Sequence, residues 1–428
     1  MLSKALRGFI VSLVGQGGRL ALSVVGTAVL ARLIAPEAFG LGSLCLVYAS
    51  FLAVFSDSGL EMSALQRARL EDAESSEIFW LQIAIAAAGS FLGLLGAPVF
   101  ALLYEQPELE LACFSVTSTL VLRALYTQHI ALARRQLRFQ LVNGLELMAR
   151  LIGLLSAIGT ALLGGGFWSL VVQYLVYQAS LVPMYWLAVR FRPRRPSLSG
   201  RVLPHISFGK WYLLNSLVQF IGHSSDRLFL GITVDATELG LYDRSRALVQ
   251  QPMSRVSHPL TAVLLPVLSR AQERPQEFRK IFLKSTKLLA WLVFPLIALL
   301  ASSADLVVEV LLGPEWSNAT PIFIVASLGG AFLPMSSTRF WLFLPLGRSR
   351  ENARLGITSV VVVVAAIALS APFGAEAVAV ARSAWLFAMF FIGLWLASME
   401  TVVGFRQAIS VLGKPVIASL LVGAVSLI

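Results

Sequence analysis

Long apolar stretches recur along the whole of this 428-residue chain and constrain its fold more than any other feature. A helix needs about 20 largely apolar residues to cross the hydrocarbon core of a bilayer. Twelve stretches predict such spans, near residues 9–32, 39–62, 78–103, 111–133, 141–163, 167–189, 207–231, 239–266, 288–312, 318–345, 355–372 and 378–399. A last stretch, 415–428, is too short to cross alone and is either the start of a thirteenth span or a partial, interfacial helix. The sequence therefore predicts an all-α membrane protein.

Composition supports this interpretation and excludes other classes of protein. Apolar residues make up 57% of the chain and charged residues 13%, whereas about 25% of the residues in soluble domains are charged. A large soluble enzyme domain, a disordered chain and a secreted disulfide scaffold are therefore excluded. The two cysteines, Cys45 and Cys113, fall inside apolar stretches, so no disulfide framework is predicted.

The basic residues indicate how the spans are oriented. A net charge of +11 in a soluble domain would suggest nucleic acid as a partner, but here most of the Lys and Arg residues fall in every second connection between spans. Basic residues collect on the cytoplasmic side of membrane proteins. The intervening connections contain no Lys or Arg, and most of them carry acidic residues. We therefore predict a cytoplasmic N-terminus and no nucleic-acid partner.

The two halves of the chain share a turn that repeats at an offset of 200 residues. Residues 31–41 end the first span, form a short acidic turn and begin the second, and residues 231–241 do the same for the seventh and eighth spans. Six spans separate the copies, so both halves have the same orientation, and repeats of this kind place a transport route at their interface. We predict six-helix lobes at 1–200 and 201–400 around a central cavity, followed by a tail at 401–428.

Several arginines lie within the predicted spans. An ionisable side chain near the bilayer centre costs about 2.5–3.5 kcal/mol on insertion scales, so it usually faces a cavity or a partner. Four lie near mid-span by residue count, namely Arg19, Arg123, Arg150 and Arg255. Five lie nearer the span ends, namely Arg227, Arg244, Arg246, Arg339 and Arg382. Only Arg150 in the first group has an acidic residue on the same helix face, Glu146, and a local ion pair is an alternative explanation for it.

Polar residues extend some of these positions into stripes. In the first span Gln16 and Arg19 belong to one polar face, and in the seventh span Asn215, Gln219, His223 and Arg227 follow four-residue steps. Because the planar guanidinium group binds phosphate oxygens with two hydrogen bonds, a cavity lined by arginines suits a diphosphate. The predicted substrate-binding residues are Arg19, Arg123, Arg150, Arg227, Arg255, Gln16, Gln219 and Gln251.

An ion-driven cycle would need titratable groups in addition to arginine. The candidates are Asp226, His223, Asp57 and Glu61, although Asp57 and Glu61 close the second span and caps at the cytoplasmic face are an alternative role for them. No P-loop, GxSxG, HExxH or CxxC sequence occurs in the chain. The sequence therefore predicts no catalytic residue, no metal site and no cofactor.

A series of motifs in the chain resembles one family of transporters. The motifs are Leu-Ala-Arg-Leu-Ile-Ala-Pro-Glu-Ala-Phe-Gly-Leu at 30–41, Arg-Arg-Gln-Leu-Arg-Phe at 134–139, Asp-Arg-Leu-Phe-Leu-Gly at 226–231, Leu-Gly-Leu-Tyr at 239–242, and the proline-containing stretch 252–270. In this order, and with twelve spans, the chain resembles Wzx-type polysaccharide flippases over roughly residues 5–400. The same superfamily holds multidrug extruders and lipid II flippases.

The resemblance implies two six-helix lobes around a cationic cavity that alternate between inward- and outward-open states, driven by an ion gradient. It implies transfer of undecaprenyl-diphosphate-linked oligosaccharide units from the cytoplasmic to the periplasmic leaflet of a bacterial inner membrane, for O-antigen, capsule or exopolysaccharide synthesis. Membrane lipids surround such a protein, and polysaccharide polymerase and chain-length proteins are further candidate partners.

Two alternatives remain open at this point. A multidrug extruder of the same superfamily would need acidic or aromatic cavity walls for organic cations, whereas the predicted walls are basic. A membrane polysaccharide polymerase or ligase commonly carries a large periplasmic loop with functional residues, and the predicted connections are all short.

Overall fold

The computed structural model describes residues 2–56, 59–66, 70–196, 203–399 and 401–425. Helices make up most of these ranges and no strand occurs within them, which confirms the predicted all-α class. The chain packs into two compact units, Met1–Ile232 and Thr233–Ile428.

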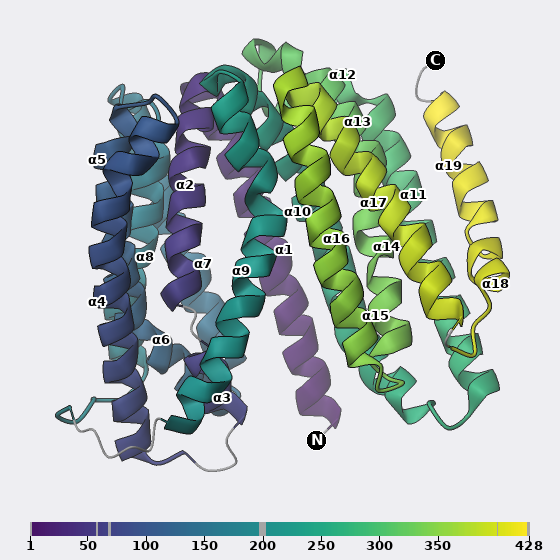
Figure 1. Ribbon diagram of the computed structural model, residues 1–428, viewed down its shortest axis with the longest axis horizontal. Coiled ribbons are helices and arrows are strands. Elements are labelled where there is room, and N and C mark those ends of the chain that lie inside the picture. The colour runs from purple at the N-terminus through teal and green to yellow at the C-terminus, as the bar shows by residue number, and fades with distance from the viewer. Residues whose placement is uncertain (1, 57–58, 67–69, 197–202, 400, 426–428) are drawn as a thin grey trace. The chain divides into compact units, whose positions relative to one another are not determined.

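The N-terminal unit is drawn from purple to teal in Figure 1. Its helices are α1 (Leu2–Leu33), α2 (Pro36–Ser56), α3 (Leu60–Gln66), α4 (Asp72–Leu103), α5 (Glu108–Thr117), α6 (Thr119–Arg135), α7 (Phe139–Leu162), α8 (Trp168–Ala188) and α9 (Leu203–Thr233).

One predicted span of this unit is interrupted, because α5 ends and α6 begins at either side of Ser118. Hydroxyl groups beside the break donate to carbonyl oxygens of the preceding turn. Thr117 Oγ1 donates to Cys113 O at 2.7 Å and Thr119 Oγ1 donates to Val116 O at 2.5 Å. Side chains that bond back to the helix in this way favour a bend, so the threonines account for the interruption.

The C-terminal unit begins with α10 (Ala236–Arg270), which stays one helix across its three internal prolines. The other elements are α11 (Pro275–Ser302), α12 (Ala304–Leu311), η1 (Pro314–Ala319), α13 (Thr320–Gly330), α14 (Phe332–Met335), α15 (Ser337–Phe343), α16 (Ser349–Ser370), η2 (Ala371–Phe373), α17 (Ala375–Met399), α18 (Phe405–Ser410) and α19 (Gly413–Val425). The predicted tenth span is therefore also an interrupted helix, from η1 to α15.

The turn that repeats in the sequence also repeats in the structure. α1 ends at Leu33 and α2 begins at Pro36, while α9 ends at Thr233 and α10 begins at Ala236, so the helix ends recur at the predicted offset of 200. The interrupted span is the fourth span of each half. It is α5–α6 in the first half and η1–α15 in the second. Two series of six long helical segments therefore follow one another along the chain.

Nine segments within the described residues are long and apolar enough to cross a membrane. They include eight of the twelve predicted spans together with Phe405–Ala424, which joins α18 and α19 and begins ten residues before the predicted last stretch. In α1 the segment Leu20–Leu33 is a shorter apolar helix. The remaining three spans, α8, α9 and α10, have at least 21 residues each, which is the length that a crossing requires.

The helix α9 packs with the N-terminal unit, although it begins the second half of the sequence repeat. Phe220 of α9 lies against Phe51 of α2, with ring centroids 5.5 Å apart. Tyr104, just after α4, donates a hydrogen bond to Leu228 O at 3.2 Å. The predicted lobe boundary at residue 200 follows the repeat, whereas the packing boundary follows the end of α9.

Small residues let the helices of the N-terminal unit approach closely, as is common in membrane proteins. A Cβ atom at Gly26 would lie 2.9 Å from Leu154 Cδ1 of α7, and one at Gly153 would lie 2.8 Å from the carbonyl oxygen of Gln173 in α8. Gly42 of α2 meets the side chain of Leu170 in α8 in the same way. These contacts fix the helices that carry the site described below.

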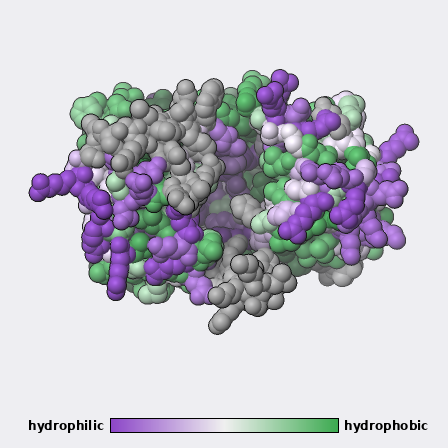
Figure 2. All heavy atoms as spheres, turned by 90° about the horizontal axis from the view of Figure 1, so that it is seen from below, coloured by the Kyte–Doolittle hydropathy of each residue, from purple (hydrophilic) through white to green (hydrophobic). Residues whose placement is uncertain are grey.

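Hydrophilic side chains lie among hydrophobic ones on the face that Figure 2 shows, seen from below Figure 1. In the N-terminal unit Arg134 and Arg135 end α6, and Arg138 lies in the connection to α7. In the C-terminal unit Arg270 ends α10, and Arg274 lies in the connection to α11. The distribution agrees with the alternation of basic connections in the sequence.

Candidate functional site

A cavity of about 540 Å³ lies within the N-terminal unit. Its walls come from α2, α6, α8 and α9, and the polar residues that line it are Ser50, Arg123, Tyr174, Tyr212, Asn215, Ser216, Gln219, His223, Ser224 and Arg227. Ligand pockets of proteins typically have about 300–1,000 Å³. The cavity is therefore large enough to hold part of a sizeable polar ligand.

The polar stripe of α9 forms one wall of this cavity. Asn215, Gln219, His223 and Arg227 follow four-residue steps along the helix, and all four line the cavity. This confirms the predicted common face, since residues four apart lie one above the other on a helix. The stripe thus turns two hydrogen-bonding amides, an imidazole and a guanidinium group toward the same space.

Arg227 is held in place by its own helix. Its Nη2 lies 3.5 Å from the hydroxyl oxygen of Ser224, one turn earlier. The preceding residue, Asp226, is fully buried, and its carboxylate accepts a hydrogen bond from the Arg227 backbone N–H at 2.9 Å. Asp226 is not among the residues that line the cavity. The Asp226 carboxylate therefore contacts the backbone of Arg227 and lies outside the cavity wall.

Arg123 of α6 also lines the cavity, whereas the polar stripe belongs to α9. It lies five residues after the interruption at Ser118, and the carbonyl oxygen of Arg123 accepts a hydrogen bond from Thr127 Oγ1 at 2.8 Å. The α6 helix is also tied to α8, because Trp186 Nε1 donates to Leu125 O at 2.8 Å. Arg123 and Arg227 thus bring two guanidinium groups from different helices to one cavity.

A second cavity, of about 150 Å³, shares Arg123 and Tyr212 with the first. Tyr212 approaches α3 closely, because a Cβ atom at Gly59 would lie 2.8 Å from the Tyr212 Cβ. Gly59 also has a φ of +72°, a backbone conformation that favours glycine. The glycine is therefore required both for its own turn and for the position of Tyr212.

Glu61 and Arg134 line the second cavity and form an ion pair. Arg134 Nη1 lies 2.7 Å from Glu61 Oε1, and Arg134 Nη2 lies 3.9 Å from Glu146 Oε1. The carboxylates of α3 and α7 therefore meet one guanidinium group of α6. Arg134 therefore lies near both Glu61, a predicted coupling residue, and Glu146. The sequence alone suggests only Arg150 as a partner of Glu146.

Tyr174 is positioned by a chain of hydrogen bonds between α6 and α8. Tyr126 donates to Gln178 Oε1 at 2.7 Å, and Gln178 Nε2 donates to the hydroxyl oxygen of Tyr174 at 3.1 Å. The ring of Tyr126 stacks on that of Tyr185, with an angle of 12° between the planes. These hydrogen bonds tie the phenol of Tyr174, at the wall of the larger cavity, to the aromatic cluster of Tyr126 and Tyr185.

Other predicted residues lie elsewhere. Arg150 is exposed on α7, with its guanidinium carbon 5.2 Å from the centre of the Tyr177 ring. Gln251 and Arg255 are partly buried on α10, in the C-terminal unit. Three further predicted residues, Gln16, Arg19 and Asp57, lie outside the residues whose side chains the structure describes.

Sequence reasoning missed the two tyrosines of the cavity. A signal for Tyr212 existed, because it precedes Asn215 by three residues and Gln219 by seven and so continues the stripe of α9. Tyr174 offers no comparable signal, since its place depends on how α8 packs against α6.

The chain matches known proteins over most of its length. Residues 29–321 match the family described as polysaccharide biosynthesis protein. The chain is 25% identical over 416 residues to the succinoglycan biosynthesis transport protein ExoT of Rhizobium meliloti (strain 1021), covering 97% of this chain and 84% of ExoT.

Two other proteins are similar to this chain. The teichuronic acid biosynthesis protein TuaB of Bacillus subtilis (strain 168) is 23% identical over 301 residues, which cover 70% of this chain and 62% of TuaB. This match therefore spans less than two thirds of the length of TuaB. The solved structure of the lipid II flippase MurJ in an inward closed conformation has a TM-score of 0.72 at 11% identity and covers 99% of this chain and 97% of that chain.

The MurJ likeness concerns the fold, an all-α membrane architecture in which two series of six helices follow one another. The family match includes the repeated turns, the interrupted α5–α6 span and the whole of the α9 stripe. Since it extends over well more than half of the residues, the chain belongs to the polysaccharide biosynthesis protein family.

Proposed function

We propose that this protein transfers undecaprenyl-diphosphate-linked oligosaccharide repeat units from the cytoplasmic to the periplasmic leaflet of a bacterial inner membrane. The product would serve O-antigen, capsule or exopolysaccharide synthesis. The family match, the name of ExoT as a transport protein and the fold shared with the lipid II flippase MurJ support this proposal. Transfer between leaflets changes no covalent bond, so the proposed function requires no catalytic residue.

The observation that carries the proposal is the cavity lined by Arg123 and Arg227. Two guanidinium groups offer planar pairs of donors, which match the oxygens of a diphosphate. The amides, hydroxyls and phenols of the same walls are donors and acceptors of the kind that bind sugar hydroxyls. A polar, basic cavity inside a helical membrane protein favours a ligand that combines an anionic group with a glycan.

The transport cycle would proceed by alternating access, with the sequence repeats 1–200 and 201–400 as the two moving lobes and 401–428 as a tail. Arg19, Arg150 and Arg255, with Gln16, Gln219 and Gln251, complete the proposed set of substrate contacts along this route. His223 faces the cavity and Glu61 the adjoining one, and with Asp57 and Asp226 they are the proposed groups for coupling to a proton or sodium gradient.

The proposed setting is a multi-pass protein of the inner membrane with a cytoplasmic N-terminus. The basic connections at one end of the helices support this orientation. Its partners would be the lipid-linked oligosaccharide and the surrounding lipids, together with polysaccharide polymerase and chain-length proteins.

The proposal is tested by replacing both cavity arginines in the native organism. Cells carrying Arg123→Gln and Arg227→Gln are expected to lose surface polysaccharide and to accumulate undecaprenyl-linked repeat units on the inner leaflet, at unchanged protein level. Arg274→Gln is the matched control, because the Arg274 side chain is 67% exposed and pairs with Glu277 at 2.7 Å. Normal surface polymer in the double variant, or polymer loss without accumulation of linked units, would contradict the proposal.

A further inference from the structure

The connection that follows α8 begins with an extended segment rich in arginine. Val189, which ends α8, already has an extended backbone, with φ of −117° and ψ of 113°. Side chains of an extended segment alternate between its two faces. Here Val189 and Phe191 are buried, whereas Arg190 and Arg192 are exposed, and the next arginines, Arg194 and Arg195, are exposed as well. The segment therefore turns its apolar residues into the N-terminal unit and its arginines outward.

Contacts with α4 and α6 hold this segment in place. The Phe191 ring lies among aromatic rings, with its centroid 6.3 Å from that of Phe79 in α4 and 5.3 Å from that of His129 in α6. Further along, Trp80 Nε1 donates to Arg194 O at 2.7 Å, and the Arg194 backbone N–H donates to Ser76 Oγ at 3.1 Å. The backbone is thus tied to the unit at two points, and the arginine side chains project from a fixed support.

A further arginine reaches the same place from the connection between α6 and α7. Arg138 Nη1 donates to Ala188 O, at the end of α8, at 3.3 Å. Arg192 Nη1 donates to Trp186 O at 3.1 Å, and its guanidinium carbon lies 5.5 Å from the centre of the Trp186 ring. Cations are favoured at a helix C-terminus, where carbonyl oxygens carry partial negative charge. The end of α8 therefore gathers arginines from two connections.

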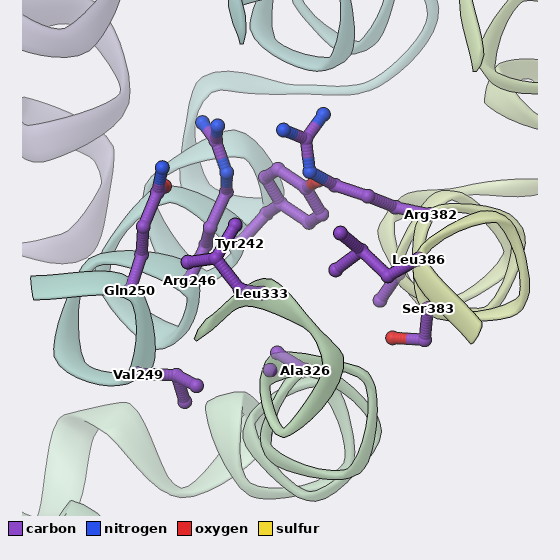
Figure 3. A pocket seen from close by; sticks show the side chains of 11 residues that line it. Tyr242, Arg246, Val249, Gln250, Ala326, Leu333, Arg382, Ser383 and Leu386 are labelled. Atoms are coloured by element: carbon purple, nitrogen blue, oxygen red, sulfur yellow. The ribbon is translucent and has the colours of Figure 1, made fainter. Parts of the chain in front are cut away.

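The five arginines form what we call the basic strip, namely Arg138, Arg190, Arg192, Arg194 and Arg195. All five are exposed, and none of them forms an ion pair with a residue that the structure describes. Other arginines have a different setting. Arg246 and Arg382 of the C-terminal unit are half-buried and line a small pocket beside Tyr242, as Figure 3 shows. The basic strip is instead a positively charged part of the outer surface.

Exposed apolar side chains adjoin the basic strip. On α8, Pro183 and Leu187 are exposed one helical turn apart, and Arg190 follows Leu187 by three residues. In the sequence before α7 and at its start, Leu137 and Phe139 flank an arginine of the strip and are 74% and 50% exposed. In a membrane protein such side chains face acyl chains, and basic residues beyond them reach the headgroups. The surface thus matches both parts of a phospholipid.

We propose that the basic strip binds the phosphate groups of anionic phospholipids, with an acyl chain along the exposed face of α8 that ends at Leu187. Arginine binds phosphate oxygens through paired N–H donors, and basic segments beside a membrane span attract anionic lipids. The strip adds to this general attraction a support that fixes where the arginines lie. None of its five residues lines the cavity of Arg123 and Arg227, so the proposal does not rest on the proposed transport function.

The test titrates the full chain, purified in a neutral detergent, with dioctanoyl phosphatidylglycerol and follows the midpoint of thermal unfolding. A ligand that binds the folded state raises that midpoint in a saturable way. Phosphatidylcholine with the same acyl chains has no net charge and is expected to bind much more weakly. Equal responses to the two lipids, or a response to neither, would overturn the proposal, and this comparison needs no variant.

A double variant, Arg190→Gln with Arg194→Gln, locates the site. Neither side chain forms a hydrogen bond or ion pair with the described residues, so the folded structure should be retained. Each lost arginine is expected to weaken the apparent affinity for phosphatidylglycerol about fivefold. Arg274→Gln with Arg279→Gln is the matched control, because it removes the same charge from exposed positions of the C-terminal unit and should leave the affinity unchanged. Equal affinities in the two double variants would refute the assignment to the basic strip.

Two further comparisons test the acyl chain. Glycerol phosphate carries the headgroup without acyl chains, and binding as tight as that of the lipid would make the strip a site for soluble phosphates and contradict the proposal. Leu187→Ser is expected to weaken lipid binding, whereas Leu162→Ser, at the far end of α7, should not. The two leucines are 83% and 70% exposed, and equal affinity in both variants would contradict the placement of the chain. None of these results alters the outcome expected for the Arg123 and Arg227 variants in cells.

Discussion

Replacing Arg123 or Arg227 with glutamine is expected to weaken the binding of a lipid diphosphate. Both guanidinium groups line the cavity of about 540 Å³ in the N-terminal unit. A hydrogen bond to a charged group contributes about 1.5–3 kcal/mol, and each 1.4 kcal/mol corresponds to about a tenfold change in Kd. Each substitution is therefore expected to raise the Kd by about 10- to 150-fold.

The double variant tests whether the two arginines hold the same group. If both bind one diphosphate, removing the second arginine costs less than removing the first, because the ligand has already lost its preferred position. Contacting residues of this kind show interaction energies of about 0.5–3 kcal/mol in double-mutant cycles. We expect an interaction of at least about 0.5 kcal/mol, so the Kd of the double variant should rise by less than the product of the two single effects.

The assay is a titration of the full chain in nanodiscs with a short-chain polyprenyl diphosphate. The salt concentration is held constant, because salt screens interactions between exposed charges. Arg274→Gln again serves as the control, since its side chain is 67% exposed. Wild-type affinity in both single variants, or an equal loss in Arg274→Gln, would refute the view that these two arginines bind the diphosphate.

Two further predictions concern the frame around the cavity and are measured as the free energy or midpoint of unfolding in one detergent. Gly42→Val is expected to destabilise the protein by about 1–3 kcal/mol, as overpacking does, because the valine side chain would clash with Leu170. Gly144→Ala is the control and should be neutral or stabilising, because no atom lies within 4 Å of the added Cβ. Gln178→Leu is expected to cost about 1–3 kcal/mol by leaving the buried Tyr126 hydroxyl without its acceptor. Unchanged stability in Gly42→Val or in Gln178→Leu would contradict the packing or the hydrogen bond, respectively.

Local pattern was sufficient to predict the features that depend on local geometry. The spacing of Asn215, Gln219, His223 and Arg227 fixes one helix face whatever surrounds the helix, and that face does line a cavity. The turn at 33–36 likewise depends on adjacent residues, so its repetition 200 residues later could be read directly from the sequence.

Features that depend on packing could not be predicted in the same way. Glu146 precedes Arg150 by one helical turn, which suggests a local pair, yet in space Glu146 lies 3.9 Å from Arg134 and Arg150 lies over Tyr177. The contact between Gly59, just before α3, and Tyr212 of α9 could not be predicted from the sequence either, because it joins segments about 150 residues apart. Spacing along one helix identifies a face, but only tertiary contacts decide what that face meets.

Hydropathy alone does not identify every helix around the site as a membrane span. Within the described residues, α9 is less apolar than the nine segments that could cross a membrane, although it has 31 residues. The same polar residues that lower its hydropathy, from Asn215 to Arg227, line the cavity. Ionisable side chains are costly against lipid, and the polar space beside α2, α6 and α8 gives those of α9 another surrounding. The residues that lower the hydropathy of α9 are therefore the ones that it contributes to the cavity wall.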